Sequence, residues 1–97
     1  MEHFDLYEDA TYGLDRANEI IGKGKDQRVA ELVVESYRKV EDLPVTDETN
    51  IRAYVESIIG SINADKREDA EKYIVELRNV ISRYQKKQIS SLKNPNQ

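Results

Sequence analysis

The chain has 97 residues, of which 38% are hydrophobic and 35% charged, and its formal net charge is −4. This length allows one small domain. The chain contains no cysteine, which excludes disulfide scaffolds, cysteine-bound zinc and thiol catalysis. With His3 as its single histidine and no glycine-rich phosphate loop, it offers few groups for catalysis. We therefore expect a non-enzymatic protein with no cofactor and no metal.

The amino-terminal segment 1–9 is acidic and lacks the apolar core of a signal peptide. No apolar run approaches the roughly 18–20 residues that a bilayer span needs. Together with the absence of cysteine, these features predict a soluble, cytoplasmic protein that does not contact a membrane.

Four segments place apolar residues at helical spacing, and the first is expected at about residues 2–21. Its stripe comprises Tyr7, Ala10, Leu14, Ala17 and Ile21. Gly22 and Gly24 follow directly, and glycine supplies the positive φ at which many helices end.

The second helix is expected from Asp26, as its N-cap, to about Val40. Its stripe comprises Val29, Val33, Tyr37 and Val40. Because Pro44 disfavours helical geometry at the preceding residue, the helix is predicted to end before Leu43.

The third helix is predicted to open within 46–49, capped by Thr46 or Asp47, and to end near Asn63. Its stripe comprises Ile51, Val55, Ile58, Ile59 and Ile62.

The fourth helix is predicted to begin near Asp65, as its cap. Its stripe comprises Ala70, Tyr73, Ile74, Leu77, Ile81 and Tyr84. Beyond Tyr84 the segment is basic and polar, and residues 93–97 are expected to form a frayed tail.

Short connections make successive helices antiparallel, so the sequence predicts an all-α, up-down-up-down four-helix bundle. Residues 1–92 would form this single domain. A three-helix arrangement, in which the third and fourth helices fuse through Asn63 and Ala64, is the alternative.

Charge is distributed unevenly along the chain. Residues 1–15 carry five acids and no lysine or arginine, whereas residues 77–97 carry five bases and no acid. In an up-down-up-down bundle these two segments lie at the same end, so their charges would face each other and help to specify the topology. The alternative is nucleic-acid binding, which the acidic net charge and the lack of interleaved aromatics disfavour. The bases it would use are Arg78, Arg83, Lys86, Lys87 and Lys93.

One face of the first helix is a candidate binding surface. At 100° per residue Tyr12 falls about 160° from Leu14, nearly opposite the core stripe. The acids predicted to surround it are Asp5, Glu8, Asp15 and Glu19. An aromatic ring among carboxylates suits a protein partner with a basic surface.

The back of the third helix is a second unusual surface, because its residues are small and uncharged. They are Ala53, Ser57, Gly60 and Ala64. Glycine costs about 1 kcal/mol relative to alanine in an exposed helix, so a close helix–helix approach at Gly60 would explain its presence. Either this helix is buried against two neighbours of its own chain, or the face forms the seam of a homodimer.

These observations lead to three hypotheses of function. The first is stoichiometric binding of a protein partner, as a regulator or inhibitor of the immunity, antitoxin or phage-modulator type. The second is a nucleic-acid or nucleoprotein component that uses the basic end of the fourth helix. The third is a purely structural homo-oligomer.

Overall fold

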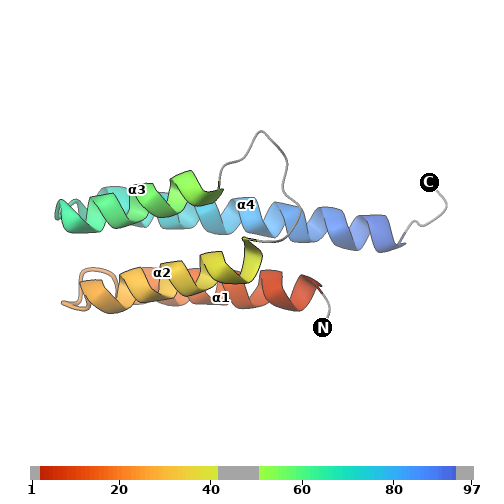
Figure 1. Cartoon of the computed structure of the whole chain (residues 1–97), viewed down its shortest axis with the longest axis horizontal. Helices are drawn as coiled ribbons and strands as arrows, with labels where there is room; N and C mark the ends of the chain where they lie inside the picture. Colours follow the sequence, from red (N-terminus) through yellow and green to blue (C-terminus); the bar gives the residue numbers. More distant parts are fainter. Residues whose placement is uncertain (1–2, 42–50, 94–97) are drawn as a thin grey trace.

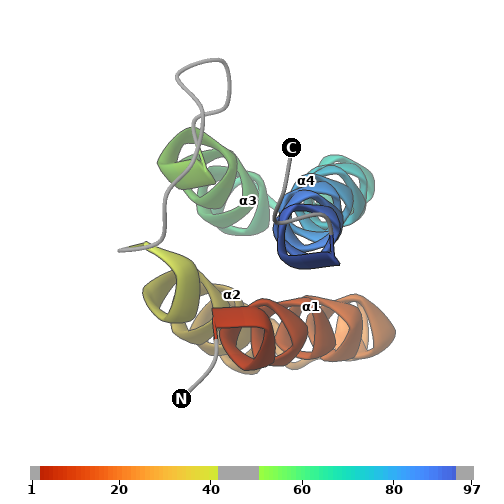
Figure 2. The same cartoon turned by 90° about the vertical axis from the view of Figure 1, so that its right-hand side faces the viewer.

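In the computed structural model, the described backbone comprises residues 3–41 and 51–93, and the described side chains are those of residues 6–41 and 51–86. Four helices follow in order: α1 (His3–Ile20), α2 (Asp26–Val40), α3 (Ile51–Asn63) and α4 (Arg67–Lys93). Each is antiparallel to the next, and α4 packs against α1 to close the ring (Figures 1 and 2). The predicted antiparallel four-helix bundle is therefore confirmed.

The core is built from the predicted stripes. All five residues of the first predicted stripe are buried, four of them on α1 and Ile21 directly after its end, and they join the buried residues of the other three helices in one cluster. The buried stripe residues of α2, α3 and α4 are Val29, Val33, Val40, Ile51, Val55, Ile58, Ala70, Ile74, Leu77, Ile81 and Tyr84. The remaining stripe positions are only partly buried at the edge of this core, namely Tyr37, Ile59, Ile62 and Tyr73.

The turn between α1 and α2 has the two positive-φ glycines that the sequence predicts. Gly22 has φ 80° and Gly24 has φ 74°. The N-cap of α2, however, is Lys25, which makes no side-chain capping bond. The prediction of Asp26 as N-cap is therefore wrong. Asp26 is the first helical residue, where its carboxylate still opposes the positive end of the helix dipole.

The prediction for Asp65 is also wrong, because this residue ends α3 instead of capping α4. Its φ is 58°, a left-handed conformation that aspartate tolerates better than most residues. The amide of Lys66 donates to the carbonyl of Ser61 at 2.8 Å, and the Asp65 amide donates to that of Ile62 at 3.1 Å. This Schellman motif separates α3 from α4, so the alternative of one fused helix is excluded.

Two predictions concern the ends of elements. The caps predicted at Thr46 and Asp47 lie outside the described residues, as do residues 94–97 of the predicted tail. The backbone of α4 is helical through Lys93, one residue into that tail. Its final turns extend beyond the start of α1 (Figure 1).

Candidate functional site

The structure places Tyr12 where the sequence predicts. Its side chain is 74% exposed, whereas Leu14, two residues on, is fully buried. Glu8, Asp15 and Glu19 are also exposed on α1, while the side chain of Asp5 lies outside the described residues. We call Glu8, Tyr12, Asp15 and Glu19 the acidic face of α1.

Two carboxylates of the acidic face form ion pairs. Asp15 accepts a hydrogen bond of 3.2 Å from Nε of Arg78 on α4, and both side chains are about half exposed. Glu19 lies 3.4 Å from Arg16, three residues earlier on the same helix. The Asp15–Arg78 pair supports the expectation that acids of α1 meet bases of α4. Glu8 forms no ion pair with any residue whose side chain is described.

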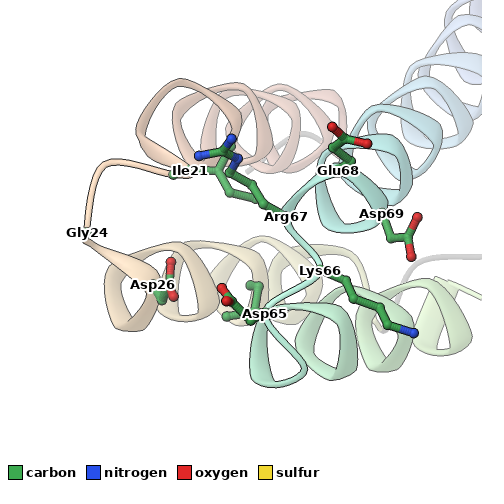
Figure 3. Close-up of a pocket in the computed structure, with 10 residues that line it drawn as sticks. Ile21, Gly24, Asp26, Asp65, Lys66, Arg67, Glu68 and Asp69 are labelled. Carbon is green, nitrogen blue, oxygen red and sulfur yellow. The ribbon is translucent and has the colours of Figure 1, made fainter.

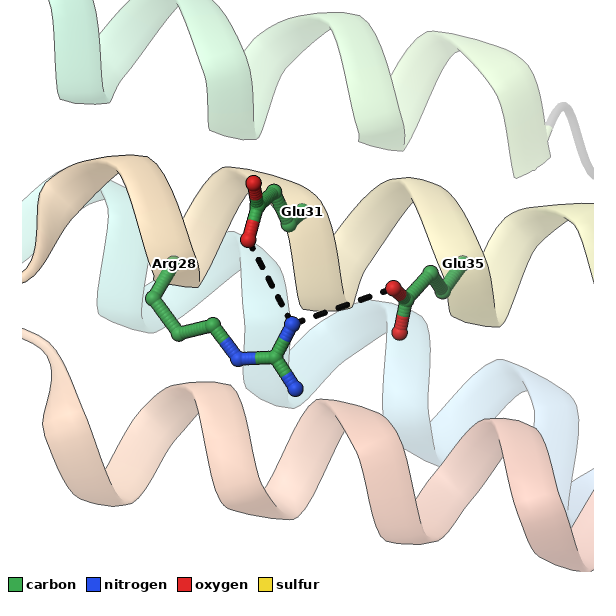
Figure 4. Close-up of polar contacts among 3 residues, drawn as sticks. All are labelled: Arg28, Glu31 and Glu35. Atoms are coloured by element: carbon green, nitrogen blue, oxygen red, sulfur yellow. Dashed lines mark hydrogen bonds and ion pairs between the residues drawn. The ribbon is translucent and has the colours of Figure 1, made fainter.

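The outer face of α2 is charged in a different way. There Arg28 lies between two glutamates of its own helix, 3.4 Å from Glu31 and 3.8 Å from Glu35 (Figure 4). All three side chains are about half exposed, and such pairs contribute little to stability. This cluster carries no exposed aromatic residue, so it lacks the anchor that Tyr12 gives the acidic face of α1.

The small-residue face of α3 is exposed along its length. Ala53, Ser57, Gly60 and Ala64 are all exposed, and no atom lies within 4 Å of where a Cβ of Gly60 would be. Although α3 contacts both α2 and α4, neither helix covers this face, so contact with two neighbours does not explain its small residues. Self-association through this face stays a prediction.

The close helix–helix approach instead occurs at Gly13 of α1. A Cβ at Gly13 would overlap the hydroxyl oxygen of Ser36 on α2. Ser36 is only 1% exposed, so this contact belongs to the interior of the α1–α2 interface. Neither residue is identifiable from the sequence, because nothing local to Gly13 indicates that Ser36 faces it.

An open pocket of about 710 Å³ lies at the end of the bundle formed by the two helix turns (Figure 3). It is lined by Ile21, Gly22, Gly24, Asp26, Ile62, Asp65, Lys66, Arg67, Glu68 and Asp69. Arg67 extends across the α1–α2 turn, while Lys66 points in the opposite direction (Figure 3). The lining mixes four acidic side chains (Asp26, Asp65, Glu68 and Asp69) with two basic ones (Lys66 and Arg67), so it presents no surface of a single charge that would select a charged ligand.

Tyr7 is the one described side chain with a buried polar atom that has no hydrogen-bond partner. It is 1% exposed, and burial together with the nearby Tyr84 raises the pKa of its hydroxyl above the ordinary value of 10.0. Its ring fills the core between α1 and α4. We therefore treat Tyr7 as part of the packing that supports the acidic face.

The predicted basic surface is described only in part. Arg83 and Lys86 are exposed on α4, Arg78 is engaged with Asp15, and the side chains of Lys87 and Lys93 lie outside the described residues. Nucleic-acid binding by this surface stays a prediction.

Two general features of the described residues bear on other kinds of site. No three acidic or histidine side chains among them are grouped so that they could hold a metal ion. None of the described helices is both long and apolar enough to cross a membrane.

Comparison of the chain with protein-family models, with curated proteins and with solved structures gave no match. The geometry described above is therefore the basis of the functional assignment.

Proposed function

We propose that this protein is a non-enzymatic binding module that recognises a second protein through the acidic face of α1. The observation that carries the proposal is Tyr12, whose ring is 74% exposed on the side of the helix opposite the core. Tyrosine presents a large, rigid apolar area with a polar tip, which is why it is enriched among the residues that dominate binding energies.

The carboxylates around Tyr12 define the chemistry of the partner. Glu8, Asp15 and Glu19 are exposed, and Arg16 is the one base among residues 6–20 of α1. Such a surface attracts a positively charged partner over distances of about 10 Å at moderate salt. The partner surface we propose is therefore basic, with room for an aromatic ring.

Within this class we propose the role of a regulator or inhibitor. A rigid bundle with an acidic face can occupy a basic site on its partner and so exclude that partner's own ligand. Immunity proteins, antitoxins and phage modulators are roles of this kind. This step rests on a general analogy between small acidic proteins, so the partner itself has to be identified by experiment.

The experiment is affinity capture from a lysate of the native host. The wild type is compared with a Tyr12→Ala, Glu8→Lys double variant, and Glu56→Lys on α3 is the control that makes the same charge reversal elsewhere. We expect the wild type and the control to retain a protein that the double variant loses. Equal retention by all three would show that the acidic face of α1 does not form the binding site.

A further inference from the structure

A second exposed apolar residue lies on α4, the helix that packs beside α1. Val75 of α4 is 44% exposed. Among the described residues, Tyr12 and Val75 are the two large apolar residues that are exposed. It lies two residues before the buried Leu77, so at 100° per residue it is about 160° around the helix from that core residue, as Tyr12 is from Leu14. Packing within the chain leaves nearly half of this side chain in contact with solvent.

The Asp15–Arg78 pair fixes the position of Val75 relative to Tyr12. Tyr12 precedes Asp15 by three residues on α1, and Val75 precedes Arg78 by three residues on α4. Residues three apart are neighbours on a helix surface, with Cβ atoms about 5–6 Å apart. Tyr12 and Val75 therefore each adjoin the 3.2 Å ion pair that joins the two helices.

The antiparallel packing of α1 and α4 places these two residues on opposite sides of the ion pair. Three residues correspond to a rise of about 4.5 Å along each helix, in opposite directions. Tyr12 and Val75 are thus offset by about 9 Å along the bundle, and the spacing of the two helix axes adds about 8–10 Å across it. They form one surface that crosses the α1–α4 boundary.

The charges on this surface are arranged unequally. On the α1 side, the exposed Glu8 has no ion-pair partner among the described side chains, whereas Glu19 pairs with Arg16; on the α4 side, the exposed Lys72 and the half-exposed Arg78 lie beside Val75. A partner that contacts both residues therefore needs its positive charge over α1 and an apolar group over Val75. Charge complementarity thus favours a basic segment that also carries apolar side chains.

We propose that Tyr12 and Val75 are two anchors of one composite site, which binds a basic, amphipathic segment of another protein across the α1–α4 boundary. This inference rests on the proposed function, to which it adds the second helix and the apolar component of the partner. The segment places one apolar side chain against Tyr12 and another against Val75, while its cations contact Glu8 and Glu19.

The test measures binding of synthetic peptides to the full chain by NMR titration of its backbone amides. The probe is a lysine–leucine peptide with helical periodicity. A glutamate–leucine peptide of the same pattern reverses the charge, and a lysine–serine peptide removes the apolar groups. The protein variants are Tyr12→Ala and Val75→Ser, with Gln27→Ser as a control at an exposed position of α2.

We expect the lysine–leucine peptide to shift amides around both Tyr12 and Val75, and the other two peptides to bind more weakly. Val75→Ser should weaken binding about fivefold, because it removes a partly exposed apolar side chain from the contact. Tyr12→Ala should weaken it by about tenfold or more. Gln27→Ser should leave the affinity unchanged.

The outcomes separate this inference from the proposed function. If Tyr12→Ala weakens binding while Val75→Ser behaves like Gln27→Ser, the site is confined to α1 and the composite site is refuted. If neither variant weakens binding, the proposed function fails as well. If the lysine–leucine peptide does not bind the wild type, or binds no better than the lysine–serine peptide, the assignment of a basic, amphipathic segment is refuted.

Discussion

The contact between Gly13 and Ser36 allows a quantitative test of the α1–α2 packing. We predict that Gly13→Ala destabilises the wild type but stabilises a Ser36→Ala variant. A Cβ at Gly13 would overlap the Ser36 hydroxyl oxygen, yet it would lie 3.6 Å from the Ser36 Cβ and 3.7 Å from the Leu32 carbonyl oxygen. The last two are ordinary van der Waals distances, so the hydroxyl is the only obstacle.

Two opposing effects set the magnitude of this prediction. Replacing glycine by alanine inside a helix contributes about 0.5–1 kcal/mol of stability. Overpacking a buried contact costs about 1–3 kcal/mol. In the wild type the net change should therefore lie between about zero and 2.5 kcal/mol of destabilisation, whereas in Ser36→Ala the favourable effect should remain alone. The expected coupling between the two positions is about 1–3 kcal/mol.

The assay is a double-mutant cycle, with the free energy of unfolding of each protein measured by urea denaturation followed by circular dichroism. Gly60→Ala is the matched control, since it is also a helical glycine but has no atom within 4 Å of the added Cβ. It should stabilise both backgrounds equally, by about 0.5–1 kcal/mol. If Gly13→Ala stabilises the wild type as much as it stabilises Ser36→Ala, the Ser36 hydroxyl moves away freely and the predicted coupling between the two positions is refuted.

Three further predictions follow from the described contacts. Tyr7→Phe should raise the free energy of unfolding by about 1 kcal/mol, because it removes a buried hydroxyl that has no partner. Burial raises the pKa of the Tyr7 hydroxyl above 10.0, so as the pH rises the unfolded chain loses this proton before the folded chain does. The wild type should therefore lose stability relative to Tyr7→Phe above about pH 10. Urea unfolding curves of both proteins, recorded below and above about pH 10, test this. Gly22→Ala should cost more stability than Gly24→Ala in thermal unfolding, because both have positive φ but only at Gly22 would the Cβ meet Arg67, at 2.5 Å; equal losses would contradict this. If α3 forms a homodimer seam, light scattering should show a dimer that Gly60→Glu dissociates, and a monomeric wild type would exclude the seam.

The fold could be predicted from the sequence because its determinants are periodic. Leu14, Ile74 and Leu77 recur at helical spacing and are fully buried, so the core faces were readable before the packing was known. The helix caps were harder to predict. Aspartate is a preferred N-cap residue, but Asp65 occupies the left-handed position that ends α3. The residue type alone does not distinguish an N-cap from a C-terminal cap when only three residues separate the two helices.

The candidate site could be predicted only where it depends on one helix. The exposure of Tyr12 follows from its angle to Leu14 on α1, and the same reasoning applied to α4 would have identified Val75, which is offset from the stripe by one residue. Neither the contact of Asp15 with Arg78 nor that of Gly13 with Ser36 could be predicted in this way. Each depends on the register between two helices, which a single helical pattern does not determine.

The Asp15–Arg78 pair links the stability of the bundle to its proposed binding function. Because both side chains are about half exposed, the pair contributes only a few tenths of a kcal/mol to stability, although it favours the packing of α1 beside α4. A weak pair can be exchanged at little cost. A lysine or arginine of a partner could therefore replace Arg78 at Asp15 without unfolding the bundle, which remains held together by the buried stripes. The same carboxylate can thus favour one topology in the free protein and contact a cation in the complex.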